Sequence, residues 1–380
     1  MEQTEVHRVT FCIDHLRRDG AQKWLVCLAM GLRSQGYDVS VVTLNDSFCN
    51  SVVAELQSRG IEVVVIGKIS LLFGFGLLRL GWYLRQRRNG ALITVLWFSD
   101  IIATTLAKVV GVRRVIRAVR ARNCDYSSLH WFFERLVARL QDAVVFNSKA
   151  SETYEAAKLG MHPVSRCVIY NWIPQPVDQA LMHQKGGASL KPVSDAASDT
   201  LVIGVLGRLA HQKNVALIIK ALSKSGQRNI VVRIAGEGAL RSELESLISE
   251  LGLQQYVSFE GYRTDALAFL SEVDLLVSAS RFEGQPNSLL EAIAVGCPVL
   301  ISDIPEHRET IGIFGEGVNI EPMFFRDNCV DSLAYTMQQL GARITPLTEI
   351  SRVMNSRAVL LSEERMITSW AHGPLAAHIS

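Results

Sequence analysis

The chain has 380 residues, more than one hydrophobic core usually serves, so we expect two domains with a cleft between them. Its hydrophobic fraction of 48% and charged fraction of 20% are typical of a folded protein and exclude a largely disordered chain. The net charge of +2 provides no overall basic character, which argues against a nucleic-acid-binding protein.

The start of the chain and its cysteines indicate a reducing compartment. The first residues are acidic and lead directly into an apolar strand, without the basic and long apolar regions of a secretory signal, so a cytoplasmic protein is expected. No Cys-x-x-Cys pair occurs, and we expect buried reduced thiols rather than disulfides or zinc ligands. The seven cysteines are Cys12, Cys27, Cys49, Cys124, Cys167, Cys297 and Cys329.

The first part of the chain alternates short β-branched runs with longer helical periods, which is typical of strand–helix–strand units around a parallel sheet. The expected strands are residues 9–13, 39–44, 61–66, 91–96, 112–119, 143–146 and 167–170. The expected helices are residues 21–34, 52–59, 71–88, 101–110, 129–139 and 150–159. These elements predict one doubly wound, Rossmann-like domain over residues 1–173.

A second domain of the same kind follows a linker. The linker is expected at residues 174–200, where residues 184–200 are rich in Gly, Ser, Ala, Lys and Asp without an apolar period and predict a flexible surface connection. Strands are then expected at residues 201–206, 230–235, 257–260, 274–278 and 298–301, and helices at 215–223, 239–251, 266–270 and 288–295. The second domain covers residues 201–380, and its closing helix, around 363–370, can cross back to the first domain.

A basic turn follows the first strand of the second domain. Ligands of open parallel sheets bind beyond the carboxyl ends of the strands, which makes residues just after these strands the candidates. Gly207 and Arg208 follow that strand, and Lys213 stands just before a helix. Two cations and helix-start N–H groups directed at one point suit a diphosphate. A solvated basic turn explains the same residues equally well.

Two further strand ends carry glycines and carboxylates. Gly236 and Gly238 would let the backbone approach a ligand closely, although Gly-x-Gly is also common in ordinary strand-to-helix turns. Glu283 lies on the loop after strand 274–278, and Glu291 lies one turn into the next helix. Such carboxylates can accept hydrogen bonds from the hydroxyls of a sugar and a ribose. The alternatives are a loop charge for Glu283 and a satisfied helix carboxylate for Glu291.

These segments together resemble the retaining GT-B glycosyltransferases of family four, the glycosyl transferases group 1. The resemblance rests on residues 204–209 with Lys213, on 235–238, and on two glutamates separated by seven residues. It extends to the first domain, where residues 19–22 resemble the glycine loop of the family, and 147–148 with 168–171 resemble its interdomain approach. It implies an α/β fold of two doubly wound Rossmann-like domains facing across a cleft.

The resemblance also implies roles for individual residues. Arg208 and Lys213 would hold the donor diphosphate and neutralise the leaving nucleotide, while Glu283 contacts the transferred sugar; these three are the expected catalytic residues. Glu291 would bind the ribose. The other expected donor-binding residues are Gly20, Gly207, Gly236, Gly238, Gly284, Gln285, Pro286, Asn287, Ser288 and Leu289. Asp19 stands where the family more often has a second glycine, so the approach of this loop to the donor is less defined.

The acceptor side is expected in the first domain. Many members of the family carry a histidine after the fourth or fifth strand, whereas residues 115–123 contain arginines and no histidine. We expect Arg120 to contact the donor or the acceptor, with a basic rim of the cleft as the alternative. His15, just after the first strand, is the other candidate acceptor contact, with an ordinary loop residue as the alternative.

The resemblance implies a metal-independent reaction without a cofactor, and no Asp-x-Asp pair or histidine cluster offers a metal site. The implied donor is a nucleotide diphosphate sugar, most often a UDP-hexose or UDP-N-acetylhexosamine. The implied acceptor is lipid-linked or a polysaccharide of the cell envelope, such as lipopolysaccharide. The alternatives are a nucleotide-sugar isomerase of the same architecture and a non-catalytic sugar-binding homologue. A dehydrogenase is disfavoured because the glycine turn at 236–238 lacks a third glycine.

Residues 69–88 form the most lipid-like segment of the chain. The stretch 69–84 is broken by glycines and Arg79 and is short for a bilayer span, so it is not expected to cross a membrane. Trp82 and Tyr83 followed by arginines are typical of a helix that docks on an anionic membrane, here the inner face of the cytoplasmic membrane. A helix packed on the sheet of the first domain is the alternative.

Overall fold

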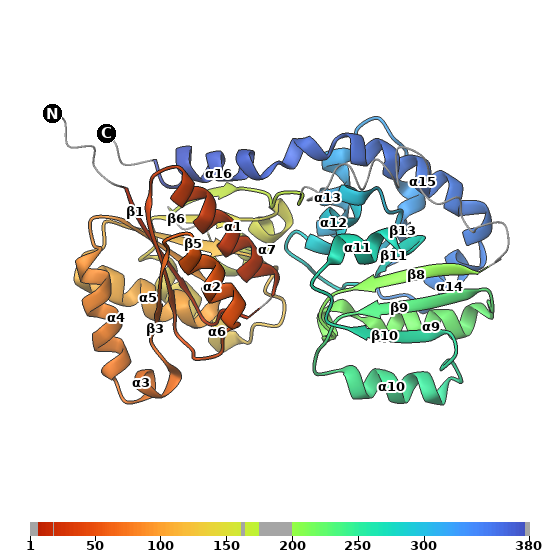
Figure 1. The fold of residues 1–380 in the computed structure, drawn as a ribbon, viewed down its shortest axis with the longest axis horizontal. Helices are drawn as coiled ribbons and strands as arrows, with labels where there is room; N and C mark the ends of the chain where they lie inside the picture. The colour runs from red at the N-terminus through yellow and green to blue at the C-terminus, as the bar shows by residue number, and fades with distance from the viewer. Residues whose placement is uncertain (1–6, 18, 161–163, 175–199, 377–380) are drawn as a thin grey trace. The chain divides into compact units, whose positions relative to one another are not determined.

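The computed structural model describes residues 7–17, 19–160, 164–174 and 200–376, without the side chains of residues 341–343. The chain divides into two compact units, one formed by Met1–Asn171 with Glu363–Ser380 and the other by Trp172–Ser362. Each unit holds one parallel sheet covered by helices on both faces (Figure 1). The linker expected at 174–200 lies outside the described residues except at its two ends.

The first unit contains a seven-stranded sheet in the order β3-β2-β1-β4-β5-β6-β7. Its strands are β1 (Arg8–Ile13), β2 (Asp38–Thr43), β3 (Glu62–Val65), β4 (Ala91–Val95), β5 (Arg114–Val119), β6 (Ala143–Phe146) and β7 (Ser165–Val168). Its helices are α1 (Gly20–Ser34), α2 (Asn50–Ser58), α3 (Lys68–Leu72), α4 (Phe75–Gln86), α5 (Trp97–Val110), α6 (Ser128–Ala138), α7 (Lys149–Leu159) and α16 (Glu363–His372).

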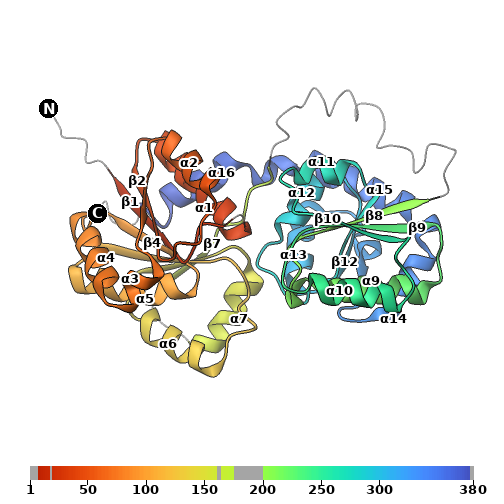
Figure 2. The ribbon, with the colours of Figure 1, turned by 60° about the horizontal axis from the view of Figure 1, so that its bottom comes forward.

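Two helical layers cover this sheet (Figure 2). Helices α1, α2 and α16 form one layer, and α4, α5, α6 and α7 form the other. The closing helix α16 packs on α1, where the Trp24 and Trp370 ring centroids are 5.4 Å apart. A Cβ on Gly31 would lie 2.1 Å from Cδ1 of Ile367, so only glycine permits this close approach of α1 and α16.

The second unit contains a six-stranded sheet in the order β10-β9-β8-β11-β12-β13. Its strands are β8 (Leu201–Leu206), β9 (Ile230–Ala235), β10 (Val257–Gly261), β11 (Leu275–Ser278), β12 (Val299–Ser302) and β13 (Phe324–Phe325). Its helices are α9 (Val215–Ser225), α10 (Arg241–Glu250), α11 (Ala266–Ser271), α12 (Asn287–Val295), α13 (Pro305–Phe314), α14 (Val330–Gln338) and α15 (Leu340–Ser356).

The expected pair of doubly wound domains is confirmed, with local differences. The single helix expected at 71–88 is wrong, because the left-handed conformation of Gly74 separates α3 from α4. Strand β7 begins two residues before the expected 167–170. Helix α13 and strand β13 were not anticipated. No disulfide joins the seven cysteines, but only Cys12 and Cys297 are fully buried, so the expectation of burial is wrong for the other five.

A buried arginine connects the central strand β5 to three helices of the first unit. The Nε of Arg117 lies 2.9 Å from Oδ2 of Asp100 on α5, and its Nη2 lies 3.1 Å from Oε2 of Glu134 on α6. Its Nη1 donates to Glu155 on α7. Three acidic side chains share one cation, and burial raises the pKa of Glu134 to about 8. Glu134 therefore holds a proton at neutral pH in the folded chain.

We expect Glu134→Gln to reduce the pH dependence of folding stability. The pKa of Glu134 is higher in the folded chain than the ordinary value of about 4.3. Its contribution to stability is therefore present below about pH 4 and is lost as the pH rises through 8. Urea unfolding between pH 5 and 9 should show a steeper loss for the wild type, by up to about 1.4 kcal/mol per pH unit. The exposed Glu55→Gln control should follow the wild type, and equal slopes for Glu134→Gln would contradict this assignment.

Candidate functional site

The three strand ends singled out in the sequence lie side by side in the second unit. Strands β9, β8 and β11 are consecutive in the sheet, and all are parallel, so their carboxyl ends meet at one edge. The loop after β8 is hydrogen-bonded to the loop after β9, since Leu209 N donates to Glu237 O at 2.9 Å and Leu240 N donates to Leu209 O at 3.2 Å. The loop after β11 is bonded to the β8 loop, since Arg281 N donates to Gln212 O at 2.9 Å.

Two glycines allow the β8 and β9 loops to pack this closely. Gly236 has φ +157, and a Cβ there would lie 1.9 Å from the carbonyl oxygen of Gly207. A Cβ on Gly238 would lie 2.3 Å from the carbonyl oxygen of Leu209. The glycine turn therefore has a structural reason that the sequence alone did not reveal: it lets one loop backbone contact the next.

An ion pair joins the basic turn to the acidic loop. The Nζ of Lys213 lies 2.5 Å from Oε1 of Glu283, whose side chain is 7% exposed. Gln212 donates from Nε2 to Oε2 of Glu283 at 3.2 Å and to the carbonyl oxygen of Phe282 at 3.0 Å. Both oxygens of Glu283 are therefore engaged, unlike those of a solvated loop charge.

Glu283 is ionised in spite of its burial. Burial by itself raises the pKa of a carboxyl group, but attraction to Lys213 and hydrogen bonds from Lys213 and Ser280 outweigh it, and the pKa of Glu283 lies below its ordinary value. The carboxylate is thus a preformed hydrogen-bond acceptor at neutral pH.

Ser302 and His307 stabilise the loop that carries Glu283, and the sequence did not predict a role for either residue. Ser302, at the end of β12, donates from Oγ to the carbonyl oxygen of Ser280 at 2.6 Å. His307 on α13 is fully buried, and its Nδ1 lies 2.8 Å from the carbonyl oxygen of Ser302. Burial lowers the pKa of His307 to about 4, so the ring is neutral and Nδ1 donates this bond. The only signal in the sequence was Pro305, a residue favoured at the first turn of a helix.

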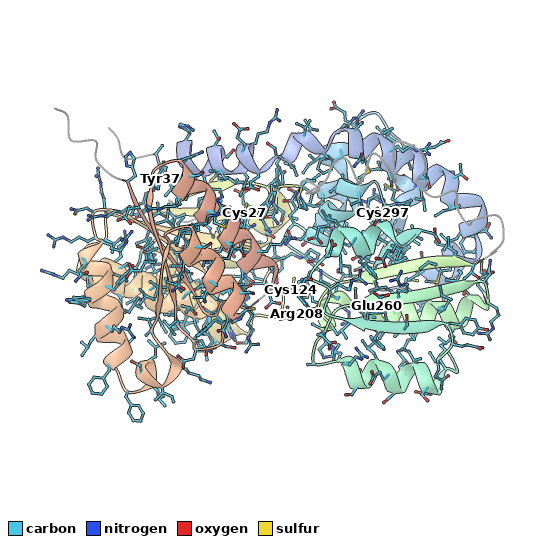
Figure 3. All side chains as sticks on the ribbon, viewed as in Figure 1. Cys27, Tyr37, Cys124, Arg208, Glu260 and Cys297 are labelled. Atoms are coloured by element: carbon cyan, nitrogen blue, oxygen red, sulfur yellow. The ribbon has the colours of Figure 1, made fainter. Side chains whose placement is uncertain are left out.

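Other residues of the expected donor site in the second unit lie on the loop after β8 and on helix α12. Helix α12 begins at Asn287, so its N-terminal N–H groups face the loop that carries Glu283. Glu291 is buried in the second turn of α12. Arg208 is exposed on the loop after β8, and no described carboxylate forms an ion pair with it (Figure 3). The structure thus brings Lys213 and Glu283 into contact and leaves the Arg208 guanidinium at the surface of the same loop.

In the first unit, the expected residues lie at the carboxyl ends of strands β1 and β5. Gly20 is the first residue of α1, preceded by Asp19 at the N-cap. His15 is held by Gln22, which donates from Nε2 to the carbonyl oxygen of His15 at 3.0 Å. Arg120 directly follows β5.

Arg120 is a partly buried cation that forms no ion pair with a described carboxylate. Its guanidinium lies 4.0 Å above the ring of Trp24, and Nη2 donates to Oδ1 of Asn171. The Nε and Nη1 atoms have no partner among the described residues. Burial lowers the pKa of Arg120 to about 9, because no carboxylate offsets the loss of water.

Within residues 7–17, 19–160, 164–174 and 200–376, no group of three His, Cys, Asp or Glu side chains is arranged to hold a metal ion. In the same part of the chain, no helix has both the length and the apolar character that a bilayer span needs.

Residues 188–338 match the family model described as Glycosyl transferases group 1. Over this segment the chain is similar to that family. The match covers the β8, β9 and β11 loops and helix α12, and therefore all the residues around Lys213 and Glu283.

Named relatives are similar to this chain over part of their length. A Campylobacter jejuni protein named N-acetylgalactosamine-N,N'-diacetylbacillosaminyl-diphospho-undecaprenol 4-alpha-N-acetylgalactosaminyltransferase is 29% identical over 182 residues, 48% of this chain and 47% of that protein. The O-antigen biosynthesis glycosyltransferase WclY of Escherichia coli is 26% identical over 168 residues, 44% of this chain and 45% of WclY. The chain thus spans about half the length of these relatives.

Solved structures are similar over nearly the whole chain. Anabaena HepE in complex with UDP-glucose has a TM-score of 0.78 and 18% identity, covering 97% of this chain and 99% of HepE. Likeness at this identity shows the fold, and it confirms the expected GT-B class of two Rossmann-like domains.

We expect Gly236→Ala to destabilise this chain by about 1–3 kcal/mol, because the new Cβ meets the Gly207 carbonyl and φ is unfavourable. Gly312→Ala is the matched control: its Cβ meets nothing within 4 Å, and its stability should equal or exceed that of the wild type. Urea unfolding curves measure both. If Gly236→Ala were as stable as Gly312→Ala, the close contact between the β8 and β9 loops would not exist.

Proposed function

We propose that this chain is a retaining glycosyltransferase that moves a hexose or N-acetylhexosamine from a UDP-sugar to a lipid-linked or polysaccharide acceptor in cell-envelope glycan synthesis. The contact between Lys213 and Glu283 at the strand edge of the family-matched segment carries this proposal. It is supported by the names of the relatives, which include an O-antigen glycosyltransferase and a diphospho-undecaprenol glycosyltransferase. HepE, in turn, has been solved with UDP-glucose.

The proposed donor site uses the three loops and the start of α12. Arg208 and Lys213 hold the diphosphate, and Glu283 accepts hydrogen bonds from the transferred sugar. Glu291 binds the ribose. The backbone of residues 284–289 at the start of α12 contributes N–H groups to the phosphate and sugar, and Gly207, Gly236 and Gly238 keep the loops close. Gly20 at the start of α1 is the proposed donor contact of the first unit.

The proposed reaction breaks the bond between the anomeric carbon and the donor phosphate oxygen. Negative charge grows on the departing diphosphate, where the Arg208 and Lys213 cations stabilise it without a metal. The acceptor hydroxyl attacks from the same face, which retains the anomeric configuration, and its proton passes to the departing phosphate. No protein nucleophile is needed. Arg120 and His15 are the proposed acceptor contacts, since both follow strands of the first sheet.

Because Lys213 already pairs with Glu283, the donor diphosphate must compete with Glu283 for this lysine. In the unliganded chain, the Glu283 carboxylate neutralises the Lys213 ammonium group. When the donor binds, its diphosphate replaces Glu283 as the partner of the Lys213 Nζ, and the carboxylate accepts hydrogen bonds from the sugar hydroxyls. Glu283 is therefore needed for transfer and at the same time opposes binding of the bare nucleotide.

We expect Glu283→Gln to abolish transfer while binding UDP more tightly than the wild type, by about fivefold, the ratio for about 1 kcal/mol. Arg208→Ala should weaken UDP binding and abolish transfer at an unchanged melting temperature, because its side chain is exposed. Calorimetry with UDP, and UDP release with and without acceptor, measure these effects. Wild-type turnover in either variant would overturn the site, and sugar conversion without UDP release would indicate an isomerase.

We further propose that the enzyme works at the inner face of the cytoplasmic membrane and contacts it through α3 and α4. Large apolar side chains are exposed there, including Leu72 at 82% and Leu78 at 73%. Residues 63–99 contain one lysine and four arginines and no acidic residue. An apolar helix surface with such a charge suits an anionic bilayer surface. The outward position of both helices at one end of the first sheet is visible in Figure 1.

We expect Leu72→Ser with Leu78→Ser to reduce cosedimentation with vesicles of anionic phospholipid by at least about tenfold, because two exposed apolar side chains no longer enter the bilayer. Binding of the wild type should also weaken between 50 and 500 mM salt, about the range over which screening becomes strong. Val359→Ser, an exposed apolar residue of the second unit, is the control and should bind as the wild type does. Equal binding by all three proteins would remove α3 and α4 from the membrane contact.

A further inference from the structure

A groove on the first unit, the β2–α3 groove, lies between the loop after β2 and the segment formed by α3 and the start of α4. Its volume of about 440 Å³ is within the range of small-molecule sites, roughly 300–1,000 Å³. Its walls combine apolar side chains with one carboxylate and one hydroxyl, and they include Asp46, Ile66, Ile69, Ser70, Phe73 and Phe75. The groove therefore offers a ligand both an apolar surface and hydrogen-bonding groups.

The groove lies at the carboxyl edge of the first sheet. Strands β1, β2 and β3 are consecutive and parallel, and Asp46 follows β2. The loop after β2 is hydrogen-bonded to the loop after β1, since Leu16 N donates to Ser47 O at 3.2 Å and Cys49 N donates to Leu16 O at 2.8 Å. The groove therefore adjoins the loop that carries His15, at the edge where open α/β sheets bind ligands.

The Asp46 carboxylate is held in the groove by the backbone that follows β3. Its Oδ2 accepts a hydrogen bond from Lys68 N at 3.3 Å. Gly67 has φ +91, and a Cβ there would lie 2.9 Å from Oδ1 of Asp46, so glycine permits the carboxylate to come this close. The described residues form no hydrogen bond to Oδ1. This oxygen can therefore accept a hydrogen bond from a ligand.

The apolar walls of the groove are open to solvent. Ile69, Phe73 and Phe75 are 71%, 71% and 72% exposed, so contact with an apolar ligand surface removes this area from water and is favourable. Leu72 and Leu78, the proposed bilayer contacts, do not line the groove. The groove and the bilayer contact therefore use different side chains of the same two helices.

The combination of groups in the groove favours an uncharged sugar ring. A hydrocarbon chain would cover the Asp46 carboxylate without offering it a hydrogen-bond donor, and an anionic head group would meet a like charge. A pyranose ring has hydroxyls that donate to a carboxylate and an apolar C–H face that packs on an aromatic ring. One such ligand satisfies both kinds of wall.

We propose that the β2–α3 groove binds an uncharged sugar residue of the acceptor glycan. The proposal rests on the glycosyltransferase function and names the chemical class of the acceptor at this place. A hydroxyl of the sugar donates to Oδ1 of Asp46, and a C–H face of its ring packs on Phe73. The sugar that receives the new bond lies toward the loop of His15, and the sugar in the groove lies farther along the acceptor.

Saturation-transfer NMR on the intact protein with saturating UDP tests the proposal. The probes are the uncharged methyl glycosides of glucose, galactose, N-acetylglucosamine and N-acetylgalactosamine, and the wild type should bind at least one of them. Asp46→Asn keeps an oxygen acceptor for Lys68 N and should bind that glycoside at least about fivefold more weakly, because the charge of the acceptor is lost. Phe73→Ala should weaken binding by a similar factor, and it should fold because the side chain is exposed.

Two controls separate the groove from a general charge effect and from the bilayer contact. Glu55→Gln removes an exposed carboxylate from α2 in the same unit and should keep the wild-type glycoside affinity. Leu72→Ser with Leu78→Ser should keep it as well. Asp46→Asn, in turn, should not lose vesicle binding.

The proposal is contradicted if the wild type binds none of the glycosides, or if either Asp46→Asn or Phe73→Ala binds them as the wild type does. It is also contradicted if dihexanoyl phosphatidylglycerol binds the wild type more tightly than any glycoside and loses affinity in Phe73→Ala, which would make the groove a lipid site. UDP affinity in the same samples tests the donor site separately, so failure of this proposal is distinguishable from failure of the glycosyltransferase function.

Discussion

The ion pair between Lys213 and Glu283 is the interaction on which the candidate site depends. It joins two loops that are 70 residues apart in the chain, and it keeps a buried carboxylate ionised where the ends of β8 and β11 meet. Glu283 can be buried there because Lys213, Gln212 and Ser280 engage its oxygens. In the proposed donor complex, a diphosphate replaces Glu283 as the partner of Lys213.

Two arginines of the first unit, Arg117 and Arg120, have different surroundings. Arg117 is surrounded by three carboxylates and ties β5 to the helices on one face of the sheet. Arg120, three residues later, has none and lies against an aromatic ring instead. The three acidic side chains around Arg117 explain its structural role. The absence of an acidic partner among the described residues around Arg120 is typical of a group that binds an anionic ligand.

Much of the fold was predictable because strands and helices alternate with different apolar periods, and helices such as α9 begin within a residue or two of expectation. Gly74 in a left-handed conformation and the charged helix α13 were not, because their patterns are local and weak. Lys213 and Glu283 were predicted to lie around one donor, because both follow strands of the same sheet, but their direct ion pair was not predicted. The burial of Arg120 on Trp24 was not, since these residues are far apart in sequence and only packing brings them together.

A crystal structure of the chain with bound UDP-sugar tests the central claim most directly. The account predicts a diphosphate oxygen within hydrogen-bond distance of the Lys213 Nζ and of the Arg208 guanidinium, with a sugar hydroxyl on the Glu283 carboxylate. A donor bound elsewhere, with the ion pair between Lys213 and Glu283 unchanged, would contradict it.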